Sequence, residues 1–466
     1  MRFSDGYHKY TKLRGEYQAF IYEGFTLSRK NGQIRLKFDF RLDDSYRFQP
    51  AMTLRSSQDT SHLSDAQIRE LAFHIGMVEL ISYWKAACPK KVIIKPYKLS
   101  KPQINFWKKL YFHGLGEFFF TNGIQPSMDD FMEIDAVSAV ELEKRYYHTT
   151  HHFIVPVGGG KDSAVSLQLL KEFYGDSREI IPFIMNPRGA SHETVEQAGY
   201  LRGDTFIVER TIDPVLLELN NKGFLNGHTP FSALLAFTSL LISAISRNKN
   251  IVLSNESSAN EPTIPGTTIN HQYSKSLEFE QDFRHYVSEY ISGQFEYFSL
   301  LRPLTELQIA RIFSRYPQYF PHFKSCNVGS KDNCWCGKCP KCLFTFIILS
   351  PFLAPHELTG IFGRNLLDDP DQKENYLELS GQSKQKPFEC VGTINEVNVS
   401  LALTVKHYAG GPSLPLLLKH FVDNGPYEDY RYGHAADYVL AELQENNIPE
   451  PLLTKLRAYL LKVNCQ

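Results

Sequence analysis

Two stretches of the sequence combine residue types and spacing that suit chemistry, and the first is a glycine loop. The letters GGGKDS at 158–163 follow an apolar run at 153–157 and precede an amphipathic segment. Consecutive glycines let backbone N–H groups approach an oxyanion without interference from Cβ atoms, and the N-terminus of a following helix adds partial positive charge. Lys161 would supply mobile positive charge, and Ser163 stands where an N-cap or a phosphate-binding hydroxyl would stand. The predicted nucleotide-binding residues of this loop are Gly158, Gly159, Gly160, Lys161, Asp162 and Ser163.

The loop matches neither of two common nucleotide-binding patterns. It lacks the G-x-x-x-x-G-K-[ST] spacing of a Walker A loop and the G-x-G-x-x-G spacing of dinucleotide-binding folds. The alternative to a phosphate site is a glycine-rich turn that only joins a strand to a helix. Because Lys, Asp and Ser follow the glycines directly, the pattern favours a nucleotide site.

The second stretch is a cluster of cysteines. Cys326, Cys336, Cys339 and Cys342 form a C-x9-C-x2-C-x2-C pattern. Zinc binds four thiolates in a tetrahedron, and a C-x2-C turn places two of them on one side of the ion. We therefore expect a closed, structural zinc site, the alternative being a group of buried free thiols. Cys334 is too close in sequence to Cys336 to share its site and is predicted to be free.

Charge and hydropathy narrow the class of protein. The 466 residues carry a formal net charge of −1, which argues against a nucleic-acid partner held by a broad basic surface. The apolar segment at 231–246 contains serines and a threonine and is shorter than the ~20 residues of a membrane span, so it is predicted to be a buried helix. The N-terminus lacks the apolar region of a signal peptide. We therefore expect a cytoplasmic protein without a nucleic-acid or membrane partner.

Residues 1–148 are predicted to form an α+β domain that begins with strands. Aromatic and β-branched runs predict strands at 18–27, 33–42, 46–54 and 90–99. Asn31 and Gly32 predict a hairpin between the first two strands. Helical periodicity predicts helices at 64–87, with Ser64 as the N-cap, and at 101–123, with an interruption at 114–116.

Residues 149–352 have the pattern of an α/β domain. Short continuous apolar runs at 151–157, 179–185, 205–210 and 250–257 alternate with helical segments. Such runs are typical of a parallel sheet that is buried on both faces, and the alternation predicts a doubly wound sheet. Residues 353–466 are predicted to be mainly helical, with amphipathic helices at 413–425 and 451–463.

The predicted sheet places further polar residues near the nucleotide. Ligands of doubly wound sheets bind at the carboxyl ends of the strands. The strand at 179–185 would bring Asn186 to the adenine or ribose. The strand at 250–257 would bring Ser254, Asn255 and Glu256 to the same edge.

The glycine loop resembles the S-G-G-x-D-S loop of the PP-loop ATP pyrophosphatases. Gly158 stands in place of the first serine of that pattern. The resemblance implies a fold of the adenine nucleotide alpha hydrolase-like type. It also implies that the loop binds the pyrophosphate end of ATP and that Asp162 helps to bind Mg²⁺.

A wider set of segments is similar to the ATP-dependent UDP-N-acetylmuramoyl-L-alanyl-L-glutamate epimerases, the MurL family. The similarity runs from about residue 80 to about residue 393 and includes the glycine loop and the cysteine cluster. It is carried by the segments 81–89, 110–124, 218–230, 253–259, 270–280, 297–307, 361–369 and 386–392. A shorter cysteine spacing, and Ser257 in place of a bulkier basic residue, are departures from the family.

This resemblance implies inversion of the terminal L-Glu of UDP-MurNAc-L-Ala-L-Glu to D-Glu, with ATP converted to AMP and pyrophosphate. Adenylation of the α-carboxylate removes its charge and makes the carbonyl an electron sink, so that ordinary side chains can remove the Cα proton. An oxazolone, formed by attack of the Ala–Glu amide oxygen, is the alternative to an open acyl-adenylate intermediate. The resemblance also suggests functional pairing with a ligase that adds L-Glu to the muramyl precursor.

Inversion needs a proton acceptor and a proton donor, and the similar segments contain candidates for both. The predicted catalytic residues are His228, Glu256, His271 and Cys390, with Glu389 as a further candidate. The residues predicted to bind the UDP or the carboxylates of the substrate are Lys275, Arg302 and Arg364. A structural role is the alternative for each, and Glu256 alternatively binds Mg²⁺. His271 and Lys275 would share one face if their segment were helical.

Two other functions compete with this interpretation. A PP-loop enzyme of the deazaguanine-nitrile or tRNA-modification type would share the glycine loop and the four cysteines, but not the other segments. A nucleotide-binding regulator without catalysis is favoured by Gly158 and disfavoured by the presence of Asp162. AMP formation that depends on one specific substrate would separate an enzyme from a regulator.

Overall fold

The computed structural model describes residues 3–30, 32–55, 57–175, 179–264, 266–408, 413–431 and 443–464. The chain is a mixed α/β protein with a large sheet and a helical C-terminal region. It forms two compact units, each built from segments that are separate in sequence. Unit 1 contains Met1–Ile154, Gly203–Ile251 and Thr267–Tyr297. Unit 2 contains Val155–Arg202, Val252–Gly266 and Phe298–Gln466.

The sheet of unit 1 is built around a long hairpin. Its strands are β1 (Ala19–Lys30), β2 (Gln33–Leu42), β3 (Tyr46–Phe48), β4 (Ala51–Arg55), β5 (Lys91–Ile94), β6 (Glu133–Ala136) and β9 (Phe206–Thr211). β2 pairs antiparallel with β1, β3 and β4, whereas β1–β5 and β5–β6 are parallel pairs. Alternate residues of β2 are buried, so its apolar side chains face the core.

The predicted hairpin is confirmed, but the chain does not begin with a strand. Lys30 pairs with Gln33, which leaves a two-residue loop, and Gly32 has a φ of 71°. Asn31 lies outside the described residues. Ahead of β1, however, the structure has a helix, α1 (Phe3–Glu16). The prediction of strands through the first 60 residues is therefore wrong at this end.

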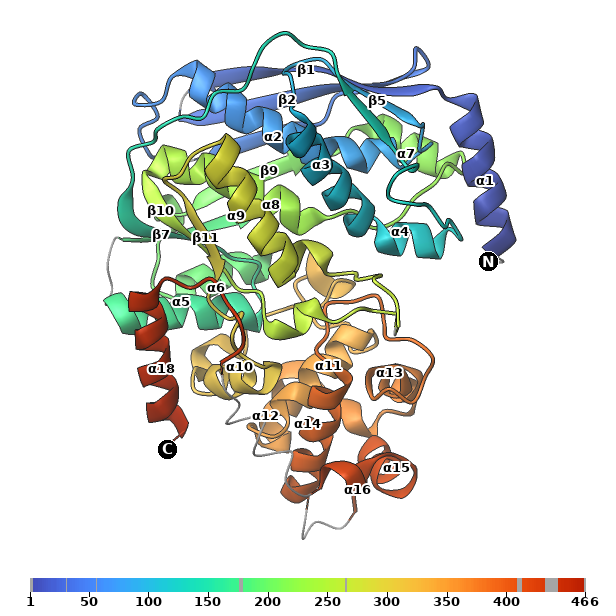
Figure 1. The fold of residues 1–466 in the computed structure, drawn as a ribbon. Helices are drawn as coiled ribbons and strands as arrows, with labels where there is room; N and C mark the ends of the chain where they lie inside the picture. Colours follow the sequence, from blue (N-terminus) through green and yellow to red (C-terminus); the bar gives the residue numbers. More distant parts are fainter. Residues whose placement is uncertain are drawn as a thin grey trace. The chain divides into compact units, whose positions relative to one another are not determined.

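The helices of unit 1 are α1, α2 (Asp65–Trp84), α3 (Lys101–Gly114), α4 (Gly116–Thr121), α7 (Pro214–Asn221), α8 (Phe231–Ser246) and α9 (Leu277–Tyr290). Four of them, α2, α3, α4 and α8, lie in segments that were predicted to be helical. Ser64 is the N-cap of α2 and accepts a hydrogen bond from the backbone N–H of Gln67. Helix α2 packs against β1, β2 and α8, and α3 packs against α9 (Figure 1). None of the described helices is long and apolar enough to cross a membrane.

The strands predicted for residues 149–352 all form, with one difference in pairing. They are β7 (Thr150–Pro156), β8 (Ile180–Met185), β9 and β10 (Asn248–Leu253), and a further strand, β11 (Glu296–Ser299), follows. β7 and β10 are parallel, as expected for an α/β sheet. β9, in contrast, pairs antiparallel with β4 of unit 1, with Ala51 opposite Thr211. Local apolar pattern specifies a strand but not its partner, which explains this difference.

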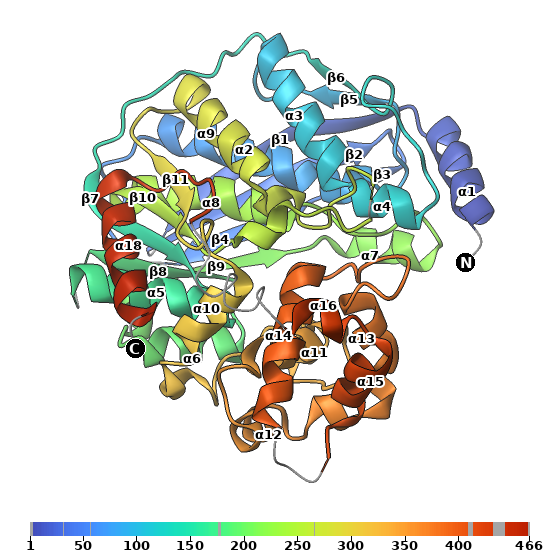
Figure 2. The same ribbon diagram turned by 60° about the horizontal axis from the view of Figure 1, so that its bottom comes forward.

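Unit 2 is rich in helices. They are α5 (Lys161–Tyr174), α6 (Gly189–Gln197), α10 (Glu306–Phe313), α11 (Pro340–Leu349), α12 (Pro355–Phe362), α13 (Lys373–Leu379), α14 (Ile394–His407), α15 (Leu416–Asn424), α16 (Tyr427–Tyr430) and α18 (Glu450–Asn464). α10 packs against α5, and α11 packs against α14 (Figure 2). α15 and α18 confirm the two helices predicted for the C-terminal region.

Seven short 3₁₀ turns connect these elements among the described residues. They are η1 (Arg202–Asp204), η2 (Ser257–Asn260), η3 (Tyr273–Lys275), η4 (Pro317–Tyr319), η5 (Gly329–Lys331), η6 (Leu366–Asp368) and η7 (Pro370–Gln372).

Candidate functional site

The glycine loop lies between the end of β7 and the first turn of α5. Gly159 has a φ of +90°, and a Cβ on it would lie 2.6 Å from the backbone of Ala190 and Ser191. Only glycine adopts this positive φ readily and has no Cβ atom to clash with that backbone. Gly160 is the N-cap of α5, so the backbone N–H groups of the first turn are free of helical partners. The loop therefore has the geometry of an anion-binding helix N-terminus.

Two details of this loop differ from the sequence prediction. Ser163 is the third residue of α5 and not its N-cap, and its hydroxyl donates to the carbonyl of Gly160 at 3.1 Å. Lys161 is buried and not mobile, because its Nζ pairs with Asp162 and, at 2.5 Å, with Glu306. Burial alone would lower the pKa of Lys161, but the neighbouring carboxylates raise it above its ordinary value. Lys161 is therefore a fixed positive charge.

Carboxylates lie close to Lys161, and those of Glu256 and Glu306 are buried. Asp162, Glu306 and Glu256 each influence its pKa. Glu396 accepts the backbone N–H of Glu306 at 2.7 Å. Burial raises the pKa values of Glu306 and Glu396; the charge of Lys161 opposes this effect at Glu306, and hydrogen bonds from Thr393 and Glu306 oppose it at Glu396. The sequence analysis identified Asp162 and Glu256 but missed Glu306, although Glu306 lies within segment 297–307, which carries the family resemblance.

The other residues predicted near the nucleotide occupy strand ends as expected. Asn186 follows β8 and has a φ of +53°. Asn255 and Glu256 follow β10, and the carbonyl of Asn255 accepts the hydroxyl of Ser299 at 2.6 Å. Arg302 is fully buried and donates to the carbonyl of Glu256 at 2.7 Å. Arg302 therefore supports the backbone of this edge, and its contact with a substrate stays a prediction.

The four predicted cysteine ligands converge in unit 2. The Sγ–Sγ distances are 3.8 Å for Cys326–Cys339, 3.7 Å for Cys336–Cys342 and 3.5 Å for Cys339–Cys342. Thiolates in a tetrahedron at the ~2.3 Å Zn–S distance would lie about 3.8 Å apart. The four residues form a group that can hold a metal ion, and Cys334 is exposed and does not belong to it. The donor set and its size fit zinc.

Arg364 supports the loop of this cysteine cluster. Its guanidinium donates to the carbonyl of Gly337 at 2.9 Å and pairs with Asp369 at 2.7 Å. Gly337 lies between Cys336 and Cys339 and has a φ of +66°. These contacts give Arg364 a structural partner, so its predicted role in substrate binding stays a prediction.

A second polar cluster lies in unit 1 and brings His228 and His271 together. Nδ1 of His271 lies 2.5 Å from Oε2 of Glu117 in α4. Nδ1 of His228 lies 3.7 Å from the same oxygen, and the two imidazole rings are 4.4 Å apart between centroids. The sequence analysis missed Glu117, although it lies in segment 110–124, which carries the family resemblance. We call Glu117, His228 and His271 the histidine cluster.

Two lysines, Lys85 and Lys275, lower the pKa of His228 in the histidine cluster. Lys85 is buried after the end of α2, and its Nζ donates to the carbonyl of Gly227, next to His228. Burial lowers the pKa of Lys85 to about 8 and that of His228 to about 4, and the charges of Lys85 and Lys275 add to the effect on His228. Lys275 ends the 3₁₀ turn η3. His271 and Lys275 therefore do not share the face of an α-helix, contrary to that part of the prediction.

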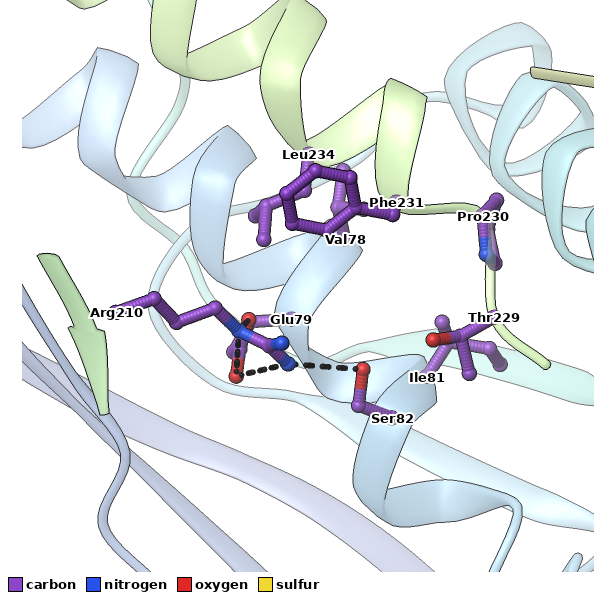
Figure 3. Close-up of a pocket in the computed structure, with 9 residues that line it drawn as sticks. All are labelled: Val78, Glu79, Ile81, Ser82, Arg210, Thr229, Pro230, Phe231 and Leu234. Atoms are coloured by element: carbon purple, nitrogen blue, oxygen red, sulfur yellow. Dashed lines mark hydrogen bonds and ion pairs between the residues drawn. The ribbon is translucent and has the colours of Figure 1, made fainter. Parts of the chain in front are cut away.

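A small cavity lies behind the loop that carries His228. Figure 3 shows the buried ion pair between Arg210 and Glu79, with the hydroxyl of Ser82 beside it. The cavity is about 10 Å³ and is also lined by Thr229 and Phe231. That volume suits a single water molecule and no larger ligand. The pair joins β9 to α2.

The predicted residues Glu389 and Cys390 lie apart from both histidines in the sequence and belong to unit 2. Glu389 accepts a hydrogen bond from the side chain of Asn327. Cys390 is half-buried and is not part of the four-cysteine group. Their predicted roles in proton transfer stay predictions.

Comparison with known proteins gives a consistent family assignment. A family model described as the MurL N-terminal domain matches residues 11–300, and one described as the MurL C-terminal domain matches residues 322–417. A UDP-N-acetyl-alpha-D-muramoyl-L-alanyl-L-glutamate epimerase of Xanthomonas oryzae pv. oryzae is 37% identical over 71% of this chain and 73% of its own length. Proteins of the same name from Micromonospora sp. and Salinispora tropica are each 34% identical over 83% of this chain, and over 86% and 84% of their own lengths. No solved structure matches the chain. The chain belongs to the MurL family.

Proposed function

We propose that this protein inverts the terminal L-Glu of UDP-MurNAc-L-Ala-L-Glu to D-Glu for peptidoglycan synthesis and that the reaction consumes ATP. The names of the three relatives support the substrate and the epimerisation. The glycine loop carries the proposal that ATP is used. The positive φ of Gly159, the uncapped N-terminus of α5 and the nearby charge of Lys161 would suit the binding of phosphate oxygens.

The chemistry explains why ATP is required. Removing a proton from Cα beside a carboxylate would place a second negative charge next to the first. Transfer of AMP to the α-carboxylate neutralises that charge, with pyrophosphate as the leaving group. The Cα–H electron pair can then move onto the carbonyl oxygen as the proton leaves. Reprotonation on the opposite face and hydrolysis of the acyl-adenylate would give D-Glu and AMP.

The residues of unit 2 suit the binding of ATP and a magnesium ion. Asp162 and Glu256 offer carboxylate oxygens, which are the ligands that Mg²⁺ prefers. A bound Mg²⁺ would offset charge on the phosphates. The backbone of 158–163 would bind pyrophosphate, and Asn186 and Asn255 would contact the adenosine. This arrangement corresponds to a PP-loop nucleotide site within the α/β fold. The four cysteines would hold a structural zinc ion.

The proposed roles of the remaining predicted residues follow from this chemistry. His228, His271, Glu256 and Cys390 are the candidates for proton transfer, and Lys275, Arg302 and Arg364 are the candidates for binding the anionic substrate. Because ATP and UDP-linked sugars are cytoplasmic metabolites, we expect the reaction to take place there. A ligase that adds L-Glu would supply the substrate.

One experiment tests the proposed function. The purified protein is incubated with ATP, Mg²⁺ and UDP-MurNAc-L-Ala-L-Glu in D₂O, and AMP, glutamate chirality and Cα deuterium are measured together. We expect AMP and D-Glu that carries deuterium at Cα, and neither from UDP-MurNAc-L-Ala alone. AMP without inversion would overturn the epimerisation, and inversion without ATP would overturn the adenylation.

The same incubation can reveal an oxazolone. If the substrate's amide oxygen is labelled with ¹⁸O, water that opens an oxazolone at the former amide carbon leaves the label in the product carboxylate, whereas opening at the former carboxyl carbon returns it to the amide. An open acyl-adenylate always leaves the label in the amide, so label in the carboxylate would demonstrate the oxazolone.

A further inference from the structure

The histidine cluster joins parts of unit 1 that are far apart in sequence. Glu117 comes from α4, His228 from the loop before α8, and His271 from the segment before η3. The side chains of Glu117 and His271 are 17% and 12% exposed, and that of His228 is 28% exposed. The group is thus largely sheltered from solvent but accessible at His228.

The contact between Glu117 and His271 sets the direction of the hydrogen bond. An ionised carboxylate only accepts hydrogen bonds, so Nδ1 of His271 must carry the proton in the 2.5 Å contact. In a neutral imidazole the lone pair then lies on Nε2. Glu117 would also stabilise the positive charge that forms when Nε2 takes a proton.

His228 differs from His271 in its relation to the carboxylate. Its Nδ1 is 3.7 Å from Oε2 of Glu117, which is too long for a hydrogen bond. Burial and the neighbouring charges lower its pKa to about 4, so His228 is neutral at neutral pH. Glu117 therefore accepts a hydrogen bond from His271 and not from His228.

The charges around this cluster favour a negatively charged ligand. Lys85, after α2, and Lys275, in η3, both influence His228 electrostatically. Arg210, on β9, acts on Lys85 in turn. Arg210 is paired with Glu79, which leaves the charges of Lys85 and Lys275 to act beside the carboxylate of Glu117. These lysines would attract the carboxylate groups of a substrate.

We propose that Glu117 is a positioning residue that makes Nε2 of His271 the base for the Cα proton of the activated glutamyl residue. This inference rests on the proposed function. The Cα–H bond breaks, an N–H bond forms at Nε2, and the electron pair moves onto the activated carbonyl oxygen as an enolate. Collapse of the enolate with a proton from solvent on the opposite face restores the C–H bond, so no oxidant or reductant is needed.

The test separates adenylation from proton transfer. Substrate-dependent exchange of labelled pyrophosphate into ATP measures adenylation, and Cα deuterium uptake in D₂O measures proton transfer. For Glu117→Gln and His271→Asn we expect deuterium uptake to fall roughly 100-fold, with pyrophosphate exchange within about threefold of wild type. Glu117→Asp, which keeps the carboxylate, should recover part of the deuterium uptake.

Glu278→Gln is the matched control. Glu278 is an exposed carboxylate of unit 1 that pairs with Lys109 at 2.7 Å, and its substitution should change neither measurement. Thermal unfolding of every variant reports whether it folds. If Glu117→Gln unfolds, His271→Asn and Glu117→Asp still provide the comparison.

Three results would overturn the inference. They are wild-type deuterium uptake in Glu117→Gln, an equal loss of pyrophosphate exchange and deuterium uptake in the folded variants, and loss of a bound metal ion upon substitution of Glu117. The last would make the histidine cluster a metal site. Absence of substrate-dependent pyrophosphate exchange in the wild-type protein would instead contradict the proposed function itself.

Discussion

At the scale of single residues, the glycine loop shows where chemistry depends on the absence of a side chain. Gly159 needs glycine twice, for its φ of +90° and for the 2.6 Å approach of Ala190 and Ser191. Its neighbour Gly158 has neither requirement, because nothing lies within 4 Å of a Cβ built there. Adjacent glycines of one loop therefore serve different purposes.

Substitution of Gly159 tests this difference. Gly159→Ala should lower the free energy of unfolding by about 1–3 kcal/mol, because the positive φ and the backbone contact both oppose a methyl group. It should also weaken ATP binding. Gly158→Ala, the matched change, should leave the unfolding midpoint in urea unchanged. Equal midpoints for both variants would contradict the proposed strain at Gly159.

Residues that belong to a local sequence motif were predictable. Residues whose role depends on a contact with a residue far away in the sequence were not. The glycines of the loop, the four cysteines that lie together and the two histidines were identified from the sequence. Glu117 was missed because its partner His271 is 154 positions away. The burial of Lys161 was missed for the same reason, since Glu306 is 145 positions away.

At the scale of elements, the cysteine cluster is tied to the start of α11. Cys339 is the N-cap of this helix and Cys342 lies in its first turn. A metal ion bound by both cysteines would fix the start of this helix. α11 in turn packs against α10, α13 and α14. Loss of the metal should therefore affect more than the loop itself.

Substitution of cysteines tests this expectation. The wild-type protein and Cys334→Ser should each contain one zinc ion per chain by atomic emission. Cys339→Ser should lose the zinc and should unfold at a lower urea concentration, because the other three thiols would no longer be joined by a metal ion. Full zinc content in Cys339→Ser would contradict the assignment of this residue as a ligand.

Local sequence patterns predicted the helices and strands better than they predicted which strands pair. The segment at 231–246 is a helix with those same bounds, and Ser64 caps α2 as expected. α1 was missed because two glycines and several polar residues weaken its helical pattern. The antiparallel pairing of β9 with β4 was not predictable, because the two strands are about 150 residues apart in sequence.

At the scale of the whole molecule, each unit is built from segments that are separated in the sequence. Unit 1 contains three such segments and so does unit 2. The predicted domain boundaries at 148 and 352 stay predictions, because a linear pattern does not reveal contacts between distant segments. The predicted PP-loop fold likewise stays a proposal, since no solved structure matches the chain.

The stability of unit 1 should decrease in acid because of a buried histidine. His74 is 1% exposed, and its ring stacks on Phe237. Burial lowers its pKa to about 4 from 6.5, so only the unfolded chain binds its proton between these values. The free energy of unfolding should be highest above pH 6.5. It should fall by about 3 kcal/mol between pH 6.5 and pH 4 and should not recover below pH 4.

Tryptophan fluorescence during urea unfolding measures this effect. Trp84 and Trp107 are buried in unit 1, so a Trp335→Phe background restricts the signal to that unit. His74→Phe should flatten the dependence on pH, and His8→Gln, at an exposed histidine, should not. An unchanged pH dependence in His74→Phe would show that other groups cause the acid sensitivity.

The open space beside Gly158 has a consequence for how the loop can evolve. A serine at position 158 would place its Cβ where no neighbouring atom lies within 4 Å. Exchange of glycine and serine there would therefore need no compensating mutation. The loop could gain or lose this hydroxyl without steric cost, whereas position 159 excludes every side chain for as long as the loop keeps its shape.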